Sequence, residues 1–185
     1  MGFDVYGLKP KENIKKPEIL DKDWQSLSDE EQDLYIEANE KHHKDNPGVY
    51  FQCNVWYWRP LWTYICRECN DVMTEEDRDA GLTNDGYEIS ADTVDKMVGK
   101  LLVGMASGKH KEYETNRALY LQSLPLRECE FCNGKGKRGI IFKKECNVCD
   151  GEGKLESFHC NYPFDHEALE EFVSFLSESG GIQIC

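Results

Sequence analysis

The sequence predicts an α+β fold: a helix-rich single domain with a small sheet and an inserted zinc-binding β-hairpin. Hydrophobic residues at 94–105 and at 169–176 recur with helical spacing, which predicts two amphipathic helices. Short β-like stretches stand near both ends, at 3–6 and 182–185, and predict strands. A cysteine phrase that occurs twice within 129–153 predicts the hairpin.

The length and composition suit one domain with a small appended module. The chain has 185 residues, of which 39% are hydrophobic and 11% aromatic, enough to bury a core. We expect a helix-rich body at 1–126 and a hairpin at 127–156, called the cysteine hairpin below. A C-terminal helix and strand at 157–185 should pack back on the body.

The sequence contains a start signal and a stop signal for the first helix. Ser28 and Glu31 fit a capping box, in which each side chain accepts a hydrogen bond from the other residue's backbone N–H. We expect the helix to end before the sequence Asn46-Pro47-Gly48. Its predicted inward residues are Leu34, Tyr35 and Ala38.

The segment "VYFQCNVWYWRPLWTYICREC" at 49–69 is the most aromatic part of the chain. We predict a strand followed by a short helix after Pro60, and then a loop at 81–90. A helix should begin at Ser90 or Asp92, and another should extend to about Ser123. The residues expected on one side of this second helix are Tyr113, Tyr120, Leu121 and Leu124. Asp165 should cap the last helix and Gly180-Gly181 should end it.

The repeated cysteine phrase has the spacing of a metal site. A Cys-x-x-Cys turn supplies two thiolates from one tight knuckle, and tetrahedral zinc takes four. Thirteen residues separate Cys132 from Cys146, enough for a hairpin that brings the two knuckles face to face. We therefore predict one structural zinc ion, with a pair of disulfides or a redox pair as the alternative. The predicted ligands are Cys129, Cys132, Cys146 and Cys149.

The same phrase, with glycines two and four residues after each knuckle, resembles the cysteine-rich repeat of DnaJ-type co-chaperones. In that family two repeats bind each zinc ion, so the resemblance implies one zinc site from the two copies here. It covers only about 127–156, and no His-Pro-Asp signature of a J domain occurs in the chain. The resemblance therefore implies a structural fastener and not co-chaperone activity.

Five basic residues lie between the knuckles of an otherwise acidic protein. One explanation is that they offset the net charge of −2 that four thiolates leave on one Zn²⁺. The other is an exposed basic surface that contacts an acidic partner or a phosphate. These residues are Lys135, Lys137, Arg138, Lys143 and Lys144, of which the first three are candidate binding residues.

A cluster of tryptophans around Arg59 is the second candidate binding site. If Trp56 and Trp58 lie on a strand, they share one face. The cluster is either part of the core, with Arg59 as a cation–π partner, or a platform on which a base, a peptide or a partner's side chain stacks. Its candidate residues are Trp56, Trp58, Arg59 and Trp62.

Cys66 and Cys69 form a third Cys-x-x-Cys pair without the flanking glycines of the other two. They are either ordinary structural cysteines or ligands of a second metal ion that would have to recruit distant residues. The absence of a nucleophile elbow, a Walker loop and a His-Glu-x-x-His motif favours a binding protein over an enzyme.

The charge and the cysteines limit the partners and the compartment. With 22 basic and 35 acidic residues the net charge is −13, which makes non-specific nucleic-acid binding unfavourable. No stretch has the length and hydrophobicity of a membrane span, and no export signal is present. Nine cysteines without an export signal imply reduced thiols or metal ligands. We therefore expect a cytoplasmic protein.

The order of segments over nearly the whole chain resembles small uncharacterised proteins of bacteriophages and some bacteria. The segments that carry this resemblance are "MGFDVYG", "GVYFQCNVWYWRPLW", "LTNDGYEIS", the paired knuckles and "FVSFLSESGGIQIC". The resemblance implies a phage or prophage setting, hence the host cytoplasm. Our hypothesis is a non-enzymatic, zinc-stabilised protein that binds a host or phage macromolecule, most readily a protein. The alternatives are a protein that binds or sequesters a nucleotide with the tryptophan cluster, and an acidic inhibitor that mimics DNA.

Overall fold

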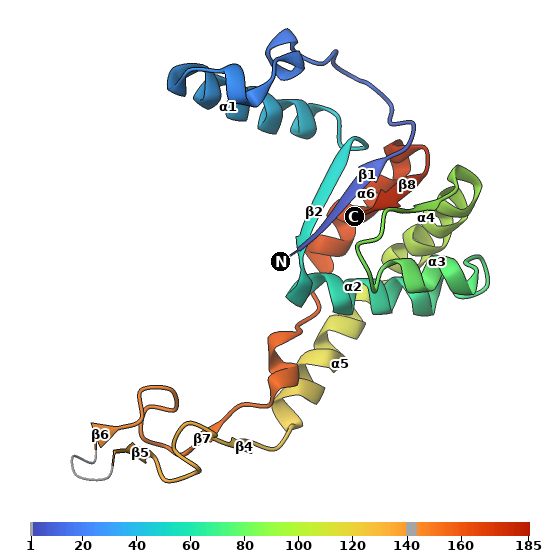
Figure 1. The fold of residues 1–185 in the computed structure, drawn as a ribbon. Helices are drawn as coiled ribbons and strands as arrows, with labels where there is room; N and C mark the ends of the chain where they lie inside the picture. The colour runs from blue at the N-terminus through green and yellow to red at the C-terminus, as the bar shows by residue number, and fades with distance from the viewer. Residues whose placement is uncertain (1, 140–143) are drawn as a thin grey trace. The chain divides into compact units, whose positions relative to one another are not determined.

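The computed structural model describes residues 2–139 and 144–185 and confirms a helix-rich α+β protein with small antiparallel sheets (Figure 1). The chain divides into two compact units, one formed by Met1–His110 with Asp165–Cys185 and the other by Lys111–Phe164. The cysteine hairpin lies within the second unit, which begins before residue 127 because it includes most of one helix. No helix of the described residues is long and apolar enough to cross a membrane.

The first unit contains a four-stranded antiparallel sheet in the order β2-β1-β8-β3. Both strands expected at the chain ends are present, and the C-terminal strand pairs directly with the N-terminal one, with Val5 opposite Ile184. Side chains alternate across this sheet: Phe3 and Val5 are buried while Tyr6 is exposed. The strands are β1 (Gly2–Gly7), β2 (Tyr50–Asn54), β3 (Tyr87–Ile89) and β8 (Ile182–Ile184).

Helices cover the buried face of the sheet. The second and sixth helices pack on β1 and β2, and the fourth helix packs on both of these helices. The core between them is aromatic, with Trp58, Trp62, Phe172 and Phe175 almost fully buried. The α-helices of this unit are α1 (Asp29–Asp45), α2 (Val55–Glu68), α3 (Glu75–Ala80), α4 (Ala91–Ala106) and α6 (His166–Ser179), and its 3-10 helices are η1 (Glu18–Asp21) and η2 (Trp24–Ser26).

Most helix boundaries follow the predicted caps. The capping box of Ser28 and Glu31 is present, and the side chains of Ser90 and Asp165 cap α4 and α6. The backbone at Gly180, with φ of 60°, ends α6 in the left-handed conformation that glycine favours.

The second unit consists of α5 (Lys109–Ser123) from Lys111 onward, the cysteine hairpin and a return segment. The hairpin has two short ladders, β4 (Arg127–Glu128) with β7 (Lys154–Leu155), and β5 (Lys137–Arg138) with β6 (Lys144–Glu145). The return segment contains η3 (Phe158–Asn161). It is joined to α5 by Arg117, whose guanidinium donates to the carbonyl oxygen of Tyr162 at 2.6 and 2.8 Å.

The prediction for the aromatic segment was wrong about where its helix begins. The strand ends at Asn54, whose side-chain oxygen accepts hydrogen bonds from the N–H groups of Trp56 and Tyr57 and starts α2 there. Pro60 therefore lies inside the helix, where it removes one backbone hydrogen bond without ending it. Trp56 and Trp58 consequently do not share a strand face.

Other corrections concern long-range packing. Tyr87–Ile89 form β3 within the predicted loop, because β8 offers these residues an unpaired edge. The short helix α3 was not predicted. Leu34, predicted to face inward, is 56% exposed, because α1 packs mainly on η1 through another face. Tyr120 and Leu121 were expected on one side of their helix, but Tyr120 is 54% exposed while Leu121 is buried.

Candidate metal centre and binding surfaces

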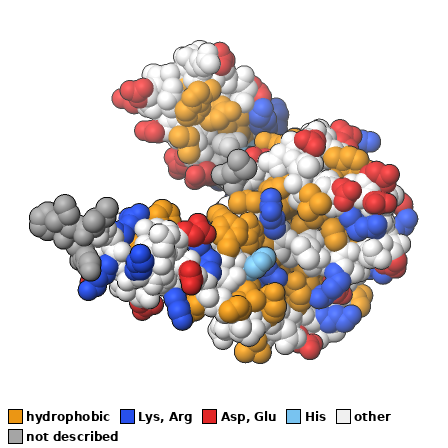
Figure 2. Space-filling view, turned by 60° about the horizontal axis from the view of Figure 1, so that its bottom comes forward, with side chains coloured by type: hydrophobic (Ala, Val, Ile, Leu, Met, Phe, Trp, Pro, Cys, Tyr) orange, Lys and Arg blue, Asp and Glu red, His pale blue; other side chains and the backbone are white. Residues whose placement is uncertain are grey.

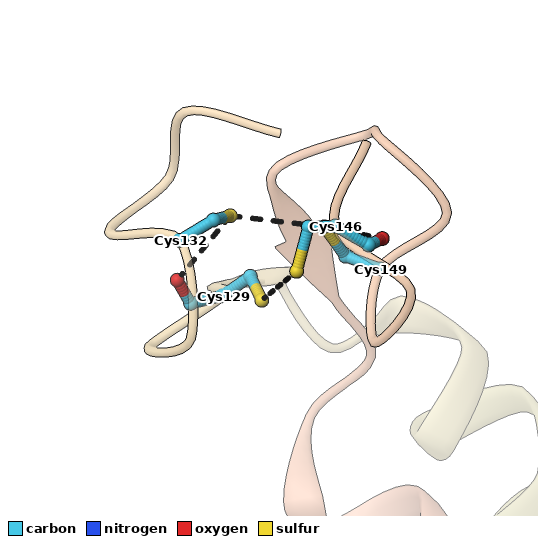
Figure 3. Close-up of side chains that lie close together, drawn as sticks. All are labelled: Cys129, Cys132, Cys146 and Cys149. Atoms are coloured by element: carbon cyan, nitrogen blue, oxygen red, sulfur yellow. Dashed lines mark hydrogen bonds between the residues drawn. The ribbon is translucent and has the colours of Figure 1, made fainter. Parts of the chain in front are cut away.

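The four predicted ligands converge at one point of the cysteine hairpin. All four side chains are buried, and their sulfur atoms lie within 4.8 Å of one another (Figure 3). The Sγ atoms of Cys129 and Cys146 are 3.9 Å apart, and those of Cys132 and Cys149 are 3.8 Å apart. A disulfide requires sulfurs about 2.05 Å apart, so these thiols are free. The group can hold one metal ion.

The two knuckles have the same local structure, which the repeated phrase encodes. In each knuckle the first cysteine's carbonyl accepts from the N–H of the second cysteine at 3.3 Å and from the next glycine's N–H at 3.1 Å. The knuckles then exchange backbone bonds: Cys129 N–H donates to Gly153 and Cys146 N–H donates to Gly136, both at 2.9 Å. The result is a pair of interlocked turns with approximate two-fold symmetry.

Backbone N–H groups also donate hydrogen bonds to two of the four sulfurs. The N–H of Gly136 donates to the Sγ of Cys132, and that of Gly153 donates to the Sγ of Cys149, both at 3.2 Å. Desolvation raises the pKa of Cys146, but hydrogen bonds from the backbone N–H groups of Val148 and Cys149 and from the thiols of Cys149 and Cys129 outweigh it and lower that pKa to about 7. Deprotonated sulfur is the form that binds metals.

Gly136 and Gly153 are the positions where no side chain fits. A Cβ atom on Gly136 would stand 2.0 Å from the carbonyl oxygen of Gly151, and one on Gly153 would stand 2.3 Å from that of Gly134. Both glycines also have positive φ values, 67° and 76°. Gly134 has a positive φ as well, but a Cβ there would meet its nearest neighbour at 3.6 Å.

We therefore expect Gly136→Ala to abolish metal retention by the hairpin, because the knuckles cannot interlock around an added methyl group. Gly134→Ala is the matched control, since it adds only the cost of a positive φ, about 1 kcal/mol. Native mass spectrometry of both variants measures the metal content of each chain. Full metal occupancy in Gly136→Ala would show that the close backbone contact is not essential.

The candidate basic residues lie on the exposed surface of the cysteine hairpin. Lys135, Lys137 and Arg138 are all exposed, and the two lysines make no ion pair with any residue that the structure describes. Lys143 lies outside the described residues. Figure 2 shows lysine and arginine side chains gathered on the hairpin.

Arg138 belongs to a contact that the sequence did not predict. Its guanidinium lies 5.2 Å from the ring centre of Phe131 and donates hydrogen bonds to Phe131's carbonyl and to Asn147. Phe131 is 57% exposed, and Val148, at the equivalent position of the other knuckle, is 37% exposed. The repeated phrase contains the signal for these exposed apolar residues. Each copy has an apolar residue directly before its second cysteine, and this residue lies outside the buried sulfur cluster.

The tryptophan cluster is divided between core and surface. Trp58 and Trp62 are 0% and 2% exposed, and their rings stack on each other with centres 5.2 Å apart. Their indole N–H groups donate to the carbonyls of Gly81 and Arg78. Trp56 and Arg59 remain on the exposed side of α2. Trp58 and Trp62 therefore belong to the core, the first of the two alternatives, because helical spacing turns them inward. The three tryptophans do not form a shared platform.

Cys66 and Cys69 lie near the end of α2 and contact different backbone carbonyls. The thiol of Cys66 is 3.9 Å from the carbonyl oxygen of Arg78, and that of Cys69 is 3.8 Å from that of Met97. Burial raises the pKa of Cys66 to about 11 and that of Cys69 to about 12, so both stay protonated near neutral pH. Within the described part of the chain, neither joins a metal-sized group of ligands.

The first unit carries the acidity of the protein. The cysteine hairpin holds seven of the 22 basic residues and six of the 35 acidic ones, so it is nearly neutral before a metal binds.

Comparisons of the chain with family models, with curated proteins and with solved structures found no match. The chemistry of the site and the surfaces around it are therefore the basis for assigning a function.

Proposed function

We propose that this protein is a non-enzymatic, zinc-stabilised binding protein that acts by association with a phage or host macromolecule. The four-sulfur cluster carries this proposal. A zinc ion about 2.3 Å from four tetrahedral thiolates places the sulfurs about 3.8 Å apart, and the sulfur pairs between the knuckles are 3.8 and 3.9 Å apart. The resemblance of the sequence to phage proteins supports the phage setting.

The zinc ion has a structural role in this proposal. Cys129, Cys132, Cys146 and Cys149 occupy all four tetrahedral positions, so no position is open for a water molecule or a substrate. When bound, the ion supplies a cross-link between the knuckles. Among its described residues the hairpin buries little besides the cysteines and the partly buried Leu155, so the metal replaces a hydrophobic core.

The exposed side of the hairpin supports a binding role. Arg138 lies directly opposite Lys144 in the β5–β6 ladder, and like charges in such a pair destabilise it. An anionic group bound between them would relieve this repulsion, and the exposed ring of Phe131 offers an apolar contact beside it. We call the exposed surface of Phe131, Lys137, Arg138 and Lys144 the hairpin surface. We therefore propose an acidic protein segment as its partner.

We expect reversal of charge on the hairpin surface to prevent capture of the partner. The test variant is Lys137→Glu with Arg138→Glu, and the matched control is Lys154→Glu with Lys111→Glu, which changes the charge equally elsewhere in the unit. Each protein is used as bait in a host lysate, and quantitative mass spectrometry compares the captured proteins. The test variant should capture at least about tenfold less of the specific partner.

Metal content is measured in the same samples, so that loss of fold is not mistaken for loss of contact. Equal capture by the test variant and wild type, with one zinc ion in each, would exclude the hairpin surface. Full capture by a folded, zinc-free variant would contradict a structural role for zinc in binding.

A further inference from the structure

A hollow on the first unit has an apolar floor and a rim of lysines. Its volume is about 420 Å³, and it lies between the end of α2, the outer face of α4 and the start of α5. Val103 on its floor is 71% exposed, more than any other exposed large hydrophobic residue that the structure describes. A Cβ on Gly99 would meet no atom within 4 Å, so the floor is open there. The lysines of the rim are Lys96, Lys100 and Lys109, and the carboxylate of Glu68 also lines the hollow.

The rim lysines have only weak partners in their own chain. They pair with Asp92 at 2.6 Å, Asp71 at 2.7 Å and Glu68 at 3.8 Å, and the lysine side chains are 37–60% exposed. Exposed ion pairs of this kind contribute about 0–1 kcal/mol each, so the lysines can change partners at little cost. A ligand for this hollow would be acidic around an apolar group.

Helix α1 presents that chemistry on its outer face. Leu34 is 56% exposed, and Glu30 and Glu37 lie beside it, four residues before and three residues after. In its own chain α1 packs mainly on η1, and on another side of the helix the ring of Tyr35 meets Trp24 edge-on. The Leu34 face is therefore an acidic helix face with one central apolar side chain, which the described part of the chain leaves exposed.

We infer that the α1 helix of a second copy docks in this hollow. Leu34 would contact Val103 on the floor, while Glu30 and Glu37 would pair with the rim lysines. If each copy places its α1 in the hollow of the other, the two contacts are identical and close a two-fold dimer. Self-association of this kind is separate from the hairpin surface, which would stay free for another partner.

Sedimentation velocity of the full chain tests the dimer. At about 150 mM salt, which screens the repulsion between two chains of net charge −13, the wild type should pass from monomer to dimer as its concentration rises. Lys100→Glu and Glu37→Lys, each alone, should raise the dimer dissociation constant at least about tenfold. Lys11→Glu, an exposed change in the same unit, is the control and should leave the constant unchanged.

Mixing the two single variants is the decisive measurement. In the mixed dimer, the glutamate introduced at position 100 of one copy would meet the lysine introduced at position 37 of the other, and the second contact would keep its natural charges. The mixture should therefore form a dimer that neither variant forms alone. A wild type that stays monomeric at about 150 mM salt, or a mixture that does not associate, would overturn the inference, even if an added acidic peptide bound the hollow. Neither result bears on partner capture by the hairpin surface.

Discussion

Replacing Cys146 with serine should release the metal and unfold the cysteine hairpin, while the first unit keeps its structure. The described residues of the hairpin have four buried cysteines and one partly buried leucine in place of a core, and the two ladders are only two residues long. Metal binding to a structural zinc site contributes about 10–16 kcal/mol of apparent free energy at neutral pH. Without that contribution, the short ladders do not offset the entropy of ordering the hairpin.

The measurement combines native mass spectrometry with amide hydrogen exchange. The variant should carry no zinc and should lose protection at the amides of Cys129, Gly136 and Cys146, which donate the hydrogen bonds of the metal centre. Amides in the β1–β8 ladder should remain protected, since that sheet belongs to the other compact unit. Wild type treated with a chelator should behave like the variant.

Cys160→Ser is the matched control. This cysteine is also in the second unit and half-buried, but its thiol contacts the carbonyl of Leu121 and lies outside the sulfur cluster. It should keep one zinc ion and full protection. Protection of the hairpin amides in zinc-free Cys146→Ser would contradict a structural role for the metal.

The features that the sequence predicted correctly depend on neighbours in the chain. Ser28 caps α1 because Glu31 is three residues away, and the knuckles form because each glycine follows its cysteines at a fixed distance. The metal centre could be predicted for the same reason, since all its ligands lie within 21 residues. Local chemistry of this kind requires no knowledge of the tertiary fold.

The features that were missed depend on which surfaces meet. The segment at 87–89 has ordinary turn residues before it, and it becomes a strand only because β8 arrives from the far end of the chain. The hydrophobic residues of α1, including Leu34, recur with helical spacing, which predicts the helix. This pattern does not show whether another element covers the face that carries Leu34. The tryptophans were placed on a strand because alternation and helical spacing cannot be distinguished over three residues.

Trp58→Ala should destabilise the first unit more than any single change on its surface. Trp58 is fully buried, stacks on Phe3 with ring centres 4.9 Å apart, and meets Phe172 edge-on at 5.6 Å. Removing a buried tryptophan costs about 3–5 kcal/mol. The carbonyl of Gly81 would also lose the indole N–H that donates to it at 2.7 Å, which adds the cost of an unsatisfied buried acceptor.

Trp56→Ala is the control from the same helix. Trp56 is 38% exposed, two residues earlier, so its loss should cost clearly less than the loss of the fully buried Trp58. Urea unfolding followed by far-ultraviolet circular dichroism gives both free energies, and Trp58→Phe separates ring packing from the hydrogen bond. A protein with Trp24→Phe and Trp56→Ala keeps only Trp58 and Trp62 and tests the nucleotide hypothesis: because these two stack on each other inside the core, added nucleotides should not quench the remaining fluorescence. Similar costs for Trp56→Ala and Trp58→Ala, together with quenching by a nucleotide, would place the cluster at a binding surface instead.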